Sequence, residues 1–368
     1  MLLHPGEKIE GILIKIPLVH PFKTSFGVEF EKEALIVKVI KGDYEGWGEV
    51  VASRLPLYSE ETISSCIKAL EEFLFPIAKK CNFEAECFEK EAKKFKGNRM
   101  AKAGVSLALM DLKGKQEGKP LWKIYGGIRK EVPVGVSVGI QKSIDELLER
   151  ISFFWEEGYL RVKIKIAPGW DVDVVKEIRK AFPQIPLGAD ANSAYTMDDF
   201  EKLAQLDPYE LMFLEQPLYN DDLYFHSRLK KKIKSPIALD ESITSARKLE
   251  EAFLMDSLSM VNIKVGRMGG INEVLKAVDF GKNEGIPFFC GGMLESGIGR
   301  AHNLHIASLP PFVLPADLSK TSRYFREDIT PPFEFSSPGH IAVPDGDGIG
   351  VEVYGEKIEK LSVLRFSL

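Results

Sequence analysis

Short apolar runs recur through the middle of the chain, and each of them ends in a charged residue. Amphipathic stretches with helical spacing, such as residues 171–182, separate the runs. The charged ends follow one another at intervals of 24 or 25 residues, and they are Lys165, Asp190, Glu215, Asp240 and Lys264. Strand-and-helix units of this length are typical of a parallel α/β sheet, and in a closed parallel barrel the strand ends meet on one face. The pattern therefore predicts that five charged side chains meet at one site.

The first third of the chain has a different pattern, in which strands precede helices. Residues 9–17 and 34–40 are rich in β-branched side chains and alternate in part, as half-buried strands do. Residues 20–27 lie between these strands and are interpreted as a loop that either covers a site or lies on the surface. Helical periodicity then covers residues 59–78 and 100–117. This section is predicted to be an α+β unit, unlike the barrel-like part that follows.

Composition and charge exclude several classes of protein. Charged residues make up 28% of the 368 residues, both signs are interspersed, and the formal net charge is −5, so a nucleic-acid partner is not expected. Charges near the start, including Glu7 and Lys8, interrupt any signal-peptide core, and no run approaches the ~18 apolar residues of a spanning helix. We therefore expect a cytoplasmic protein with no membrane partner.

The four cysteines are expected to be reduced and mostly buried. They are Cys66, Cys81, Cys87 and Cys290, and they show neither a CxxC pair nor zinc-like spacing. Reduced thiols are usual in a cytosolic protein.

Asp190, Glu215 and Asp240 are three carboxylates at successive strand ends. Placed close together they would repel one another, and a divalent cation would remove that cost. Hard oxygen ligands suit Mg²⁺ or Mn²⁺ rather than zinc. The alternative is that each carboxylate caps the following helix or pairs with a lysine. Because all three carboxylates recur at the same position at the ends of successive strands, the metal site is favoured over this alternative.

Lys163 and Lys165 are two residues apart on a strand, so their side chains point to the same face. Their mutual repulsion and a nearby cation would lower a lysine pKa from ~10.4 toward the ~7–8 that suits a general base. Lys264 ends a strand across the barrel from Lys165. This arrangement suits removal of a proton α to a carboxylate, with a metal stabilising the resulting enediolate.

These residues resemble the enolase superfamily, and specifically its muconate-lactonizing-enzyme subgroup. The likeness is closer to o-succinylbenzoate synthases and N-acylamino acid (N-succinylamino acid) racemases. The resemblance covers nearly the whole chain. The segments that carry it contain either a strand-end charge or a glycine-rich turn, and they are residues 163–171, 190–196, 214–218, 262–270 and 290–297.

The resemblance implies an α/β fold, a (β/α)7β TIM-like barrel with an α+β capping domain. Residues 1–130 would form the capping domain, residues 131–322 the barrel, and residues 323–368 a C-terminal segment that completes the capping domain.

It also implies roles for the site residues. Lys165 would be the acid/base lysine of the Lys163-Ile164-Lys165 motif, and Lys264 its partner on the opposite face. The metal carboxylates would bind Mg²⁺ (or Mn²⁺). The loop 20–27 would close over a small carboxylate substrate. The residues expected to line the substrate pocket are Phe22, Ser137, Asn192, Gly292 and Met293. One departure is Val265, because proline often follows the lysine in similar sequences. A homo-oligomer is expected, and the sequence leaves its order open.

The enzyme interpretation has two versions that share one half-reaction. A synthase removes the α-proton and expels a β-hydroxyl to give 2-succinylbenzoate for menaquinone synthesis, whereas a racemase exchanges the α-proton of an N-acyl amino acid. A dipeptide epimerase or a muconate cycloisomerase is the alternative. A mandelate-type racemase would require a late His–Asp pair, but His302, His305 and Asp317 are interpreted as packing or surface residues. A non-catalytic scaffold would have lost part of the charged series, which is complete here.

Overall fold

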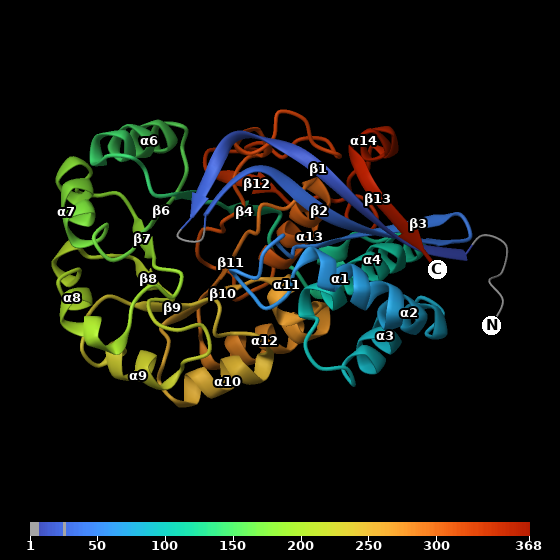
Figure 1. The fold of residues 1–368 in the computed structure, drawn as a ribbon, viewed down its shortest axis with the longest axis horizontal. Helices are drawn as coiled ribbons and strands as arrows, with labels where there is room; N and C mark the ends of the chain where they lie inside the picture. The colour runs from blue at the N-terminus through green and yellow to red at the C-terminus, as the bar shows by residue number, and fades with distance from the viewer. Residues whose placement is uncertain (1–6, 25–26) are drawn as a thin grey trace.

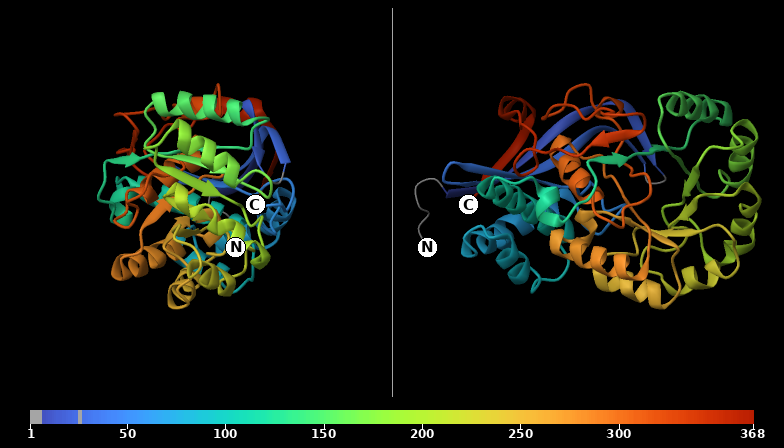
Figure 2. Two further views of the ribbon diagram at one scale, coloured as in Figure 1. Left: turned by 90° about the vertical axis from the view of Figure 1, so that its left-hand side faces the viewer. Right: turned by 180° about the vertical axis from the view of Figure 1, so that it is seen from behind.

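The computed structural model describes residues 7–24 and 27–368, and they form two parts placed side by side (Figure 1). One part is a ring of short parallel strands surrounded by helices, and the other is a twisted antiparallel sheet with helices against it. Seen from behind in Figure 2, the green to orange helices form the outer rim of the ring, whereas blue and red segments from the two ends of the chain lie together in the other part. None of the helices in these residues is long and apolar enough to cross a membrane.

Seven parallel strands follow chain order around the ring, from β5 to β11. They are β5 (Val136–Val138), β6 (Val162–Lys165), β7 (Leu187–Asp190), β8 (Phe213–Glu215), β9 (Ile237–Leu239), β10 (Met260–Ile263) and β11 (Phe288–Cys290). The strand ends lie level, because Lys165 pairs with Asp190 and Asp190 pairs with Glu215. Glu215 pairs in turn with Ala238, two residues before Asp240. The predicted barrel strands and the alignment of their charged ends are confirmed.

A segment outside the named strands occupies the eighth position of the ring. On one side, the backbone N–H of Asp317 donates to the carbonyl of Cys290 at 2.8 Å. On the other side, the N–H of Ala316 donates to the carbonyl of Pro133 at 2.8 Å. Residues 311–317 therefore bridge β11 to the chain that leads into β5 and close the ring.

Helices cover the outside of the ring, and α7 shows why the sequence forms them. The side chain of Asp171 accepts a hydrogen bond from the first helical N–H, and the buried positions Val174, Val175 and Ile178 form one apolar stripe. The helices of this part are α6 (Ile144–Glu156), α7 (Val172–Ala181), α8 (Phe200–Ala204), α9 (Tyr224–Lys230), α10 (Ala246–Leu254), α11 (Val265–Met268), α12 (Ile271–Glu284) and α13 (Gly297–Ala307).

The capping part is built from both ends of the chain. Its sheet has the order β13-β1-β2-β3, formed by β13 (Ser362–Ser367), β1 (Glu7–Thr24), β2 (Gly27–Lys41) and β3 (Tyr44–Val50). In β13, Ser367 lies opposite Glu10 of β1. Helix α4 (Arg99–Glu117) approaches β3 closely, since a Cβ on Gly48 would lie 2.2 Å from the carbonyl oxygen of Gly104. Glycine at this strand position therefore permits the contact.

The remaining elements are short. They are α1 (Ile63–Ala69), a π-helical turn (Leu70–Leu74), α2 (Phe75–Lys80), α3 (Ala85–Ala92), α5 (Leu121–Tyr125), β4 (Glu131–Pro133), β12 (His340–Ala342), α14 (Gly355–Leu361) and 3₁₀ turns at Met197–Asp199, Asp207–Tyr209 and Thr321–Arg323.

Two boundaries differ from the prediction. Helix α1 begins at Ile63 rather than near residue 59, because the Thr62 side chain accepts the capping hydrogen bond. Strand pairing continues into the expected loop 20–27, so that β1 ends at Thr24 and β2 begins at Gly27. Residues 25–26 lie outside the described residues.

The prediction of four reduced cysteines is wrong for one pair. Cys81 and Cys87 form a disulfide between the end of α2 and α3, with their Cα atoms 5.5 Å apart. The turn between these helices brings the two side chains together, which their spacing in the sequence did not reveal. Cys66 and Cys290 are free and buried, as expected.

Candidate active site

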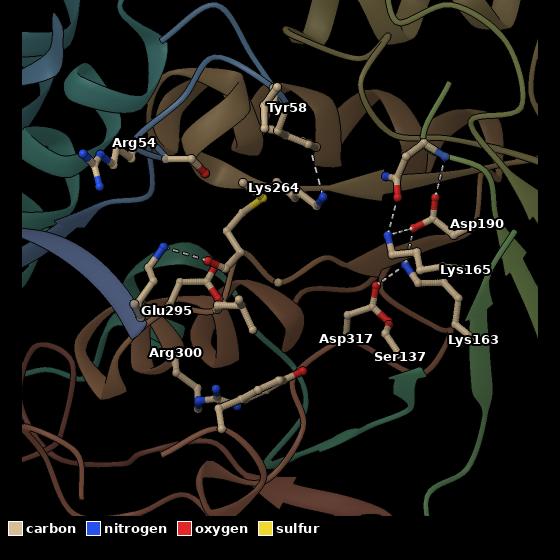
Figure 3. A pocket seen from close by; sticks show the side chains of 18 of the residues that line it. Arg54, Tyr58, Ser137, Lys163, Lys165, Asp190, Lys264, Glu295, Arg300 and Asp317 are labelled. Atoms are coloured by element: carbon tan, nitrogen blue, oxygen red, sulfur yellow. Dashed lines mark hydrogen bonds and ion pairs between the residues drawn. The ribbon is translucent and has the colours of Figure 1, made fainter. Parts of the chain in front are cut away.

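A cavity of about 340 Å³ is lined jointly by the ring and the capping part (Figure 3). The ring contributes side chains at or just beyond its strand ends, namely Ser137, Lys163, Lys165, Asp190, Asn192, Lys264 and Asp317. The capping part contributes Lys32 and, from one loop, Ser53, Arg54, Leu55, Leu57 and Tyr58. The chain after β11 contributes residues 292–295.

Lys165 reaches the cavity from the end of β6, on the same side as Asp190 (Figure 3). Its Nζ lies 2.6 Å from Oδ2 of Asp190 and 2.6 Å from Oδ1 of Asn192. The Asn192 amide also donates to Oε1 of Glu241 at 3.0 Å, which fixes the orientation of its oxygen toward the lysine. The amine of Lys165 is therefore held at the cavity by two oxygen atoms.

Lys264 reaches the same cavity from the end of β10. Its Nζ lies 2.7 Å from Oδ2 of Asp240 and 3.2 Å from the hydroxyl oxygen of Tyr58, and 4.4 Å above the Tyr58 ring. Strands β6 and β10 are four positions apart in a ring of eight, so Lys165 and Lys264 approach from opposite sides. Arg267 also donates to Oδ1 of Asp240, and Tyr58 donates to the same oxygen at 3.0 Å.

Lys163 is buried between three carboxylates. Its Nζ lies 2.5 Å from Oδ2 of Asp317, 2.7 Å from Oε2 of Glu215 and 3.4 Å from Oδ2 of Asp190. Burial lowers the pKa of Lys163, but the three carboxylates outweigh burial and raise it above the ordinary lysine value. Burial likewise lowers the pKa of Lys264, and Tyr58 with neighbouring carboxylates raises it above the ordinary value. The expected lowering of lysine pKa is therefore wrong for Lys163, because its ammonium group contacts carboxylates directly.

The three expected metal carboxylates are buried and are held by cations. Asp190 contacts Lys165, Glu215 contacts Lys163, and Asp240 contacts Lys264 and Arg267. In the part of the chain that the structure describes, no three His, Cys, Asp or Glu side chains are grouped as metal ligands.

The chemistry of this donor set nevertheless fits a divalent cation. The carboxylates end adjacent strands β7, β8 and just beyond β9, and they are hard oxygen donors. Oε2 of the neighbouring Glu241 is buried and finds no hydrogen-bond partner among the described residues. Lysine ammonium groups now balance negative charge that a dication could balance instead.

The structure brings most of the expected substrate residues to the cavity. Ser137, Asn192, Gly292 and Met293 all line it, and the Ser137 hydroxyl donates to Oδ1 of Asp317 at 3.1 Å. The side chain of Phe22 lies outside the described residues, so its role stays a prediction.

The interpretation of Asp317 as a packing or surface residue is wrong. It lines the cavity at the end of the eighth ring position. Burial raises its pKa, but Lys163 and Arg161 outweigh burial and hold the pKa well below the usual range. The signal was present, because residues 311–316 are an apolar run that ends in a charge. The interpretation of His302 and His305 as packing residues is confirmed, since both are fully buried in α13 and bond to backbone carbonyls.

Tyr58 was missed for a different reason. It comes from a loop of the capping part, 182 residues before its partner Asp240. No local pattern connects these two positions, so only the packing of the two parts reveals the contact.

The fold and the site define a barrel enzyme with a capping domain, and two family models match the two parts separately. Residues 146–358 match the model described as "Enolase C-terminal domain-like". Residues 9–126 match "Mandelate racemase / muconate lactonizing enzyme, N-terminal domain". The chain belongs to this family of the enolase superfamily, and it is an enzyme.

Individual relatives resemble nearly the whole chain. An o-succinylbenzoate synthase of Geobacillus kaustophilus is 45% identical over 350 residues, which cover 94% of this chain and 93% of the relative. An N-succinylamino acid racemase of Thermus thermophilus is 42% identical over 358 residues and 97% of each chain. A solved structure of an enolase-superfamily member from Listeria innocua superposes with a TM-score of 0.93 at 38% identity, covering 99% of this chain and 98% of that one.

Proposed function

We propose that this enzyme removes a proton α to a carboxylate with Lys165 and Lys264, and that it acts as an o-succinylbenzoate synthase, an N-succinylamino acid racemase, or both. The observation that carries the proposal is the approach of the two lysines to one cavity from opposite positions of the ring. The names of the two relatives support both activities for a chain this similar. The substrate would be a small carboxylate that fits the cavity between the ring and the capping part.

The proposed cofactor is Mg²⁺ or Mn²⁺, bound by Asp190, Glu215 and Asp240. When bound, the cation would supply positive charge for the substrate carboxylate and for the charge that develops on it during proton removal. Lys163, buried beside Asp190 and Glu215, would add positive charge on the β6 side.

In the racemase reaction, the Lys165 amine would take the α-proton from one face, and the Lys264 ammonium would deliver a proton to the other. The reverse reaction exchanges their roles. Asn192 and Asp190 would orient Lys165, and Asp240 with Tyr58 would orient Lys264, through the hydrogen bonds described above.

In the synthase reaction, Lys165 would take the α-proton, and the ammonium so formed would donate a proton to the departing β-hydroxyl, which leaves as water. Lys264 would remain an ammonium group and stabilise negative charge from the other side. Both reactions therefore begin with the same proton removal and differ in the second proton transfer.

The test is to assay the purified protein with Mg²⁺ on both substrates, 2-succinyl-6-hydroxy-2,4-cyclohexadiene-1-carboxylate and a series of N-succinylamino acids of each configuration. We expect turnover of at least one substrate class, and the ratio of kcat/KM values assigns the preferred one. A folded, metal-loaded protein that neither turns over these substrates nor exchanges their α-protons would overturn the proposal.

A further inference from the structure

Asp317 connects the closing segment of the ring to the buried charges behind the cavity. Its Oδ2 accepts from Lys163 at 2.5 Å, and its Oδ1 accepts from Arg161 at 2.5 Å and from Ser137 at 3.1 Å. Arg161 is fully buried. The Asp317 carboxylate therefore lies between two buried cations, Arg161 and Lys163, which are two residues apart and so point to the same face of the chain at β6.

Arg161 fixes the position of this carboxylate. Its guanidinium lies 5.4 Å and 5.6 Å from the ring centroids of Phe213 and Phe289, and a Cβ on Gly135 would lie 2.6 Å from its Nε. Its Nε and Nη1 find no hydrogen-bond partner within the described chain, which leaves Asp317 as the carboxylate that balances its charge. The guanidinium group of Arg161 is therefore fixed, and it holds the Asp317 carboxylate in place.

The other neighbours of Lys163 are two of the proposed metal ligands, Glu215 at 2.7 Å and Asp190 at 3.4 Å. A buried ammonium group must be balanced by a carboxylate, because an unpaired charge is costly in the interior. Without Asp317, Lys163 would depend on Glu215 and Asp190 alone and would compete with a cation for them.

We propose that Asp317 is a positioning residue that draws Lys163 toward the closing segment of the ring and so leaves Asp190 and Glu215 available to a divalent cation. The inference rests on the proposed metal-dependent function and adds a residue outside the ligand set. Asp317 acts through Lys163, so its effect on metal affinity depends on the lysine charge.

The test is a double-mutant cycle on Mn²⁺ affinity, measured by calorimetric titration of the full-length protein after chelation. Asp317→Asn should weaken Mn²⁺ binding about 10- to 100-fold, the range found when partners of metal ligands are removed. In a Lys163→Met background, the same substitution should change the affinity less than about threefold, since no ammonium group remains to be displaced.

A matched control separates positioning from general destabilisation. Asp111→Asn also removes a fully buried carboxylate that pairs with a lysine, Lys115 at 2.8 Å, but in the capping part. It should lower the melting temperature and leave the Mn²⁺ dissociation constant unchanged.

Two outcomes would overturn the inference: an unchanged Mn²⁺ affinity in Asp317→Asn, or an equal loss with and without Lys163. If Asp317→Asn does not fold, the variant that also carries Lys163→Met removes one charge of each sign and is compared with Lys163→Met alone. If the Mn²⁺ affinities of the double variant and of Lys163→Met agree within threefold, the inference is supported. A weaker Mn²⁺ affinity of the double variant refutes it. Failure of the wild-type protein to bind Mn²⁺ would instead refute the proposed metal dependence.

Discussion

Lys165 and Lys264 point into one cavity from strands that lie four positions apart in a ring of eight. An α-carbon bound between them carries a single hydrogen, which faces Lys165 in one enantiomer and Lys264 in the other. Each lysine should therefore exchange the proton of only one enantiomer of an N-succinylamino acid.

Single substitutions in deuterated water check this relationship. Lys264→Ala should still incorporate deuterium into the enantiomer that Lys165 serves, while racemisation stops, and Lys165→Ala should show the opposite selectivity. Each substitution should lower overall turnover at least 10²- to 10⁴-fold, the usual contribution of general acid–base catalysis. Equal exchange of both enantiomers by either variant would contradict the opposite-face arrangement.

Removal of the divalent cation should abolish activity without unfolding the protein. The lysines and Arg267 pair with the three carboxylates, so the buried charges keep partners in metal-free protein. Added Mg²⁺ should restore turnover and raise the free energy of unfolding, by about 2.7 kcal/mol at a concentration 100 times the dissociation constant. The measurements are turnover and thermal unfolding before and after chelation. Full activity in a sample shown by metal analysis to be metal-free would reject the assignment.

Tyr58→Phe should affect the Lys264 side of the reaction more than the Lys165 side. The substitution keeps the ring that stacks on the ammonium group but removes the hydroxyl 3.2 Å from Nζ. We expect about a 10-fold loss of deuterium exchange for the enantiomer served by Lys264, comparable to one hydrogen bond to a charged group. Exchange of the other enantiomer should change by less than about threefold. Equal losses for both enantiomers would show that Tyr58 acts on the whole cavity.

Burial of His302 should make the protein less stable in acid. Burial lowers the pKa of this side chain to about 3, from an ordinary value of 6.5, so the histidine is neutral in the folded state. Between these two values the unfolded chain binds the extra proton. The contribution of the neutral, buried histidine to the free energy of unfolding is therefore complete above pH 6.5. It falls by about 1.4 kcal/mol per pH unit as the pH drops toward 3.

His302→Gln should remove that slope. Chemical denaturation of both proteins at several pH values would measure it, and the difference in unfolding free energy between wild type and variant should be constant above pH 7. A constant difference down to pH 4 as well would mean that the histidine titrates equally in both states.

The sequence by itself determined the ring and most of its chemistry. The period of 24 or 25 residues placed Lys165, Asp190 and Glu215 at the ends of neighbouring strands, and the structure pairs those residues in register. This succeeds because each βα unit repeats the same local geometry, so a side chain at the end of one strand must lie beside the end of the next. Helix α4 was likewise predicted over nearly its full length, because its periodicity is long and local.

The tertiary structure decided which of these charges balance one another and what else faces the cavity. Asp317 belongs to the site because residues 311–317 close the ring, and that position depends on both neighbouring strands rather than on the segment's own pattern. Tyr58 contacts Lys264 only because the capping part packs over the strand ends, and Cys81 meets Cys87 only because two helices turn back on each other. A periodic pattern encodes contacts between repeating neighbours, whereas contacts between distant segments depend on how the whole chain packs.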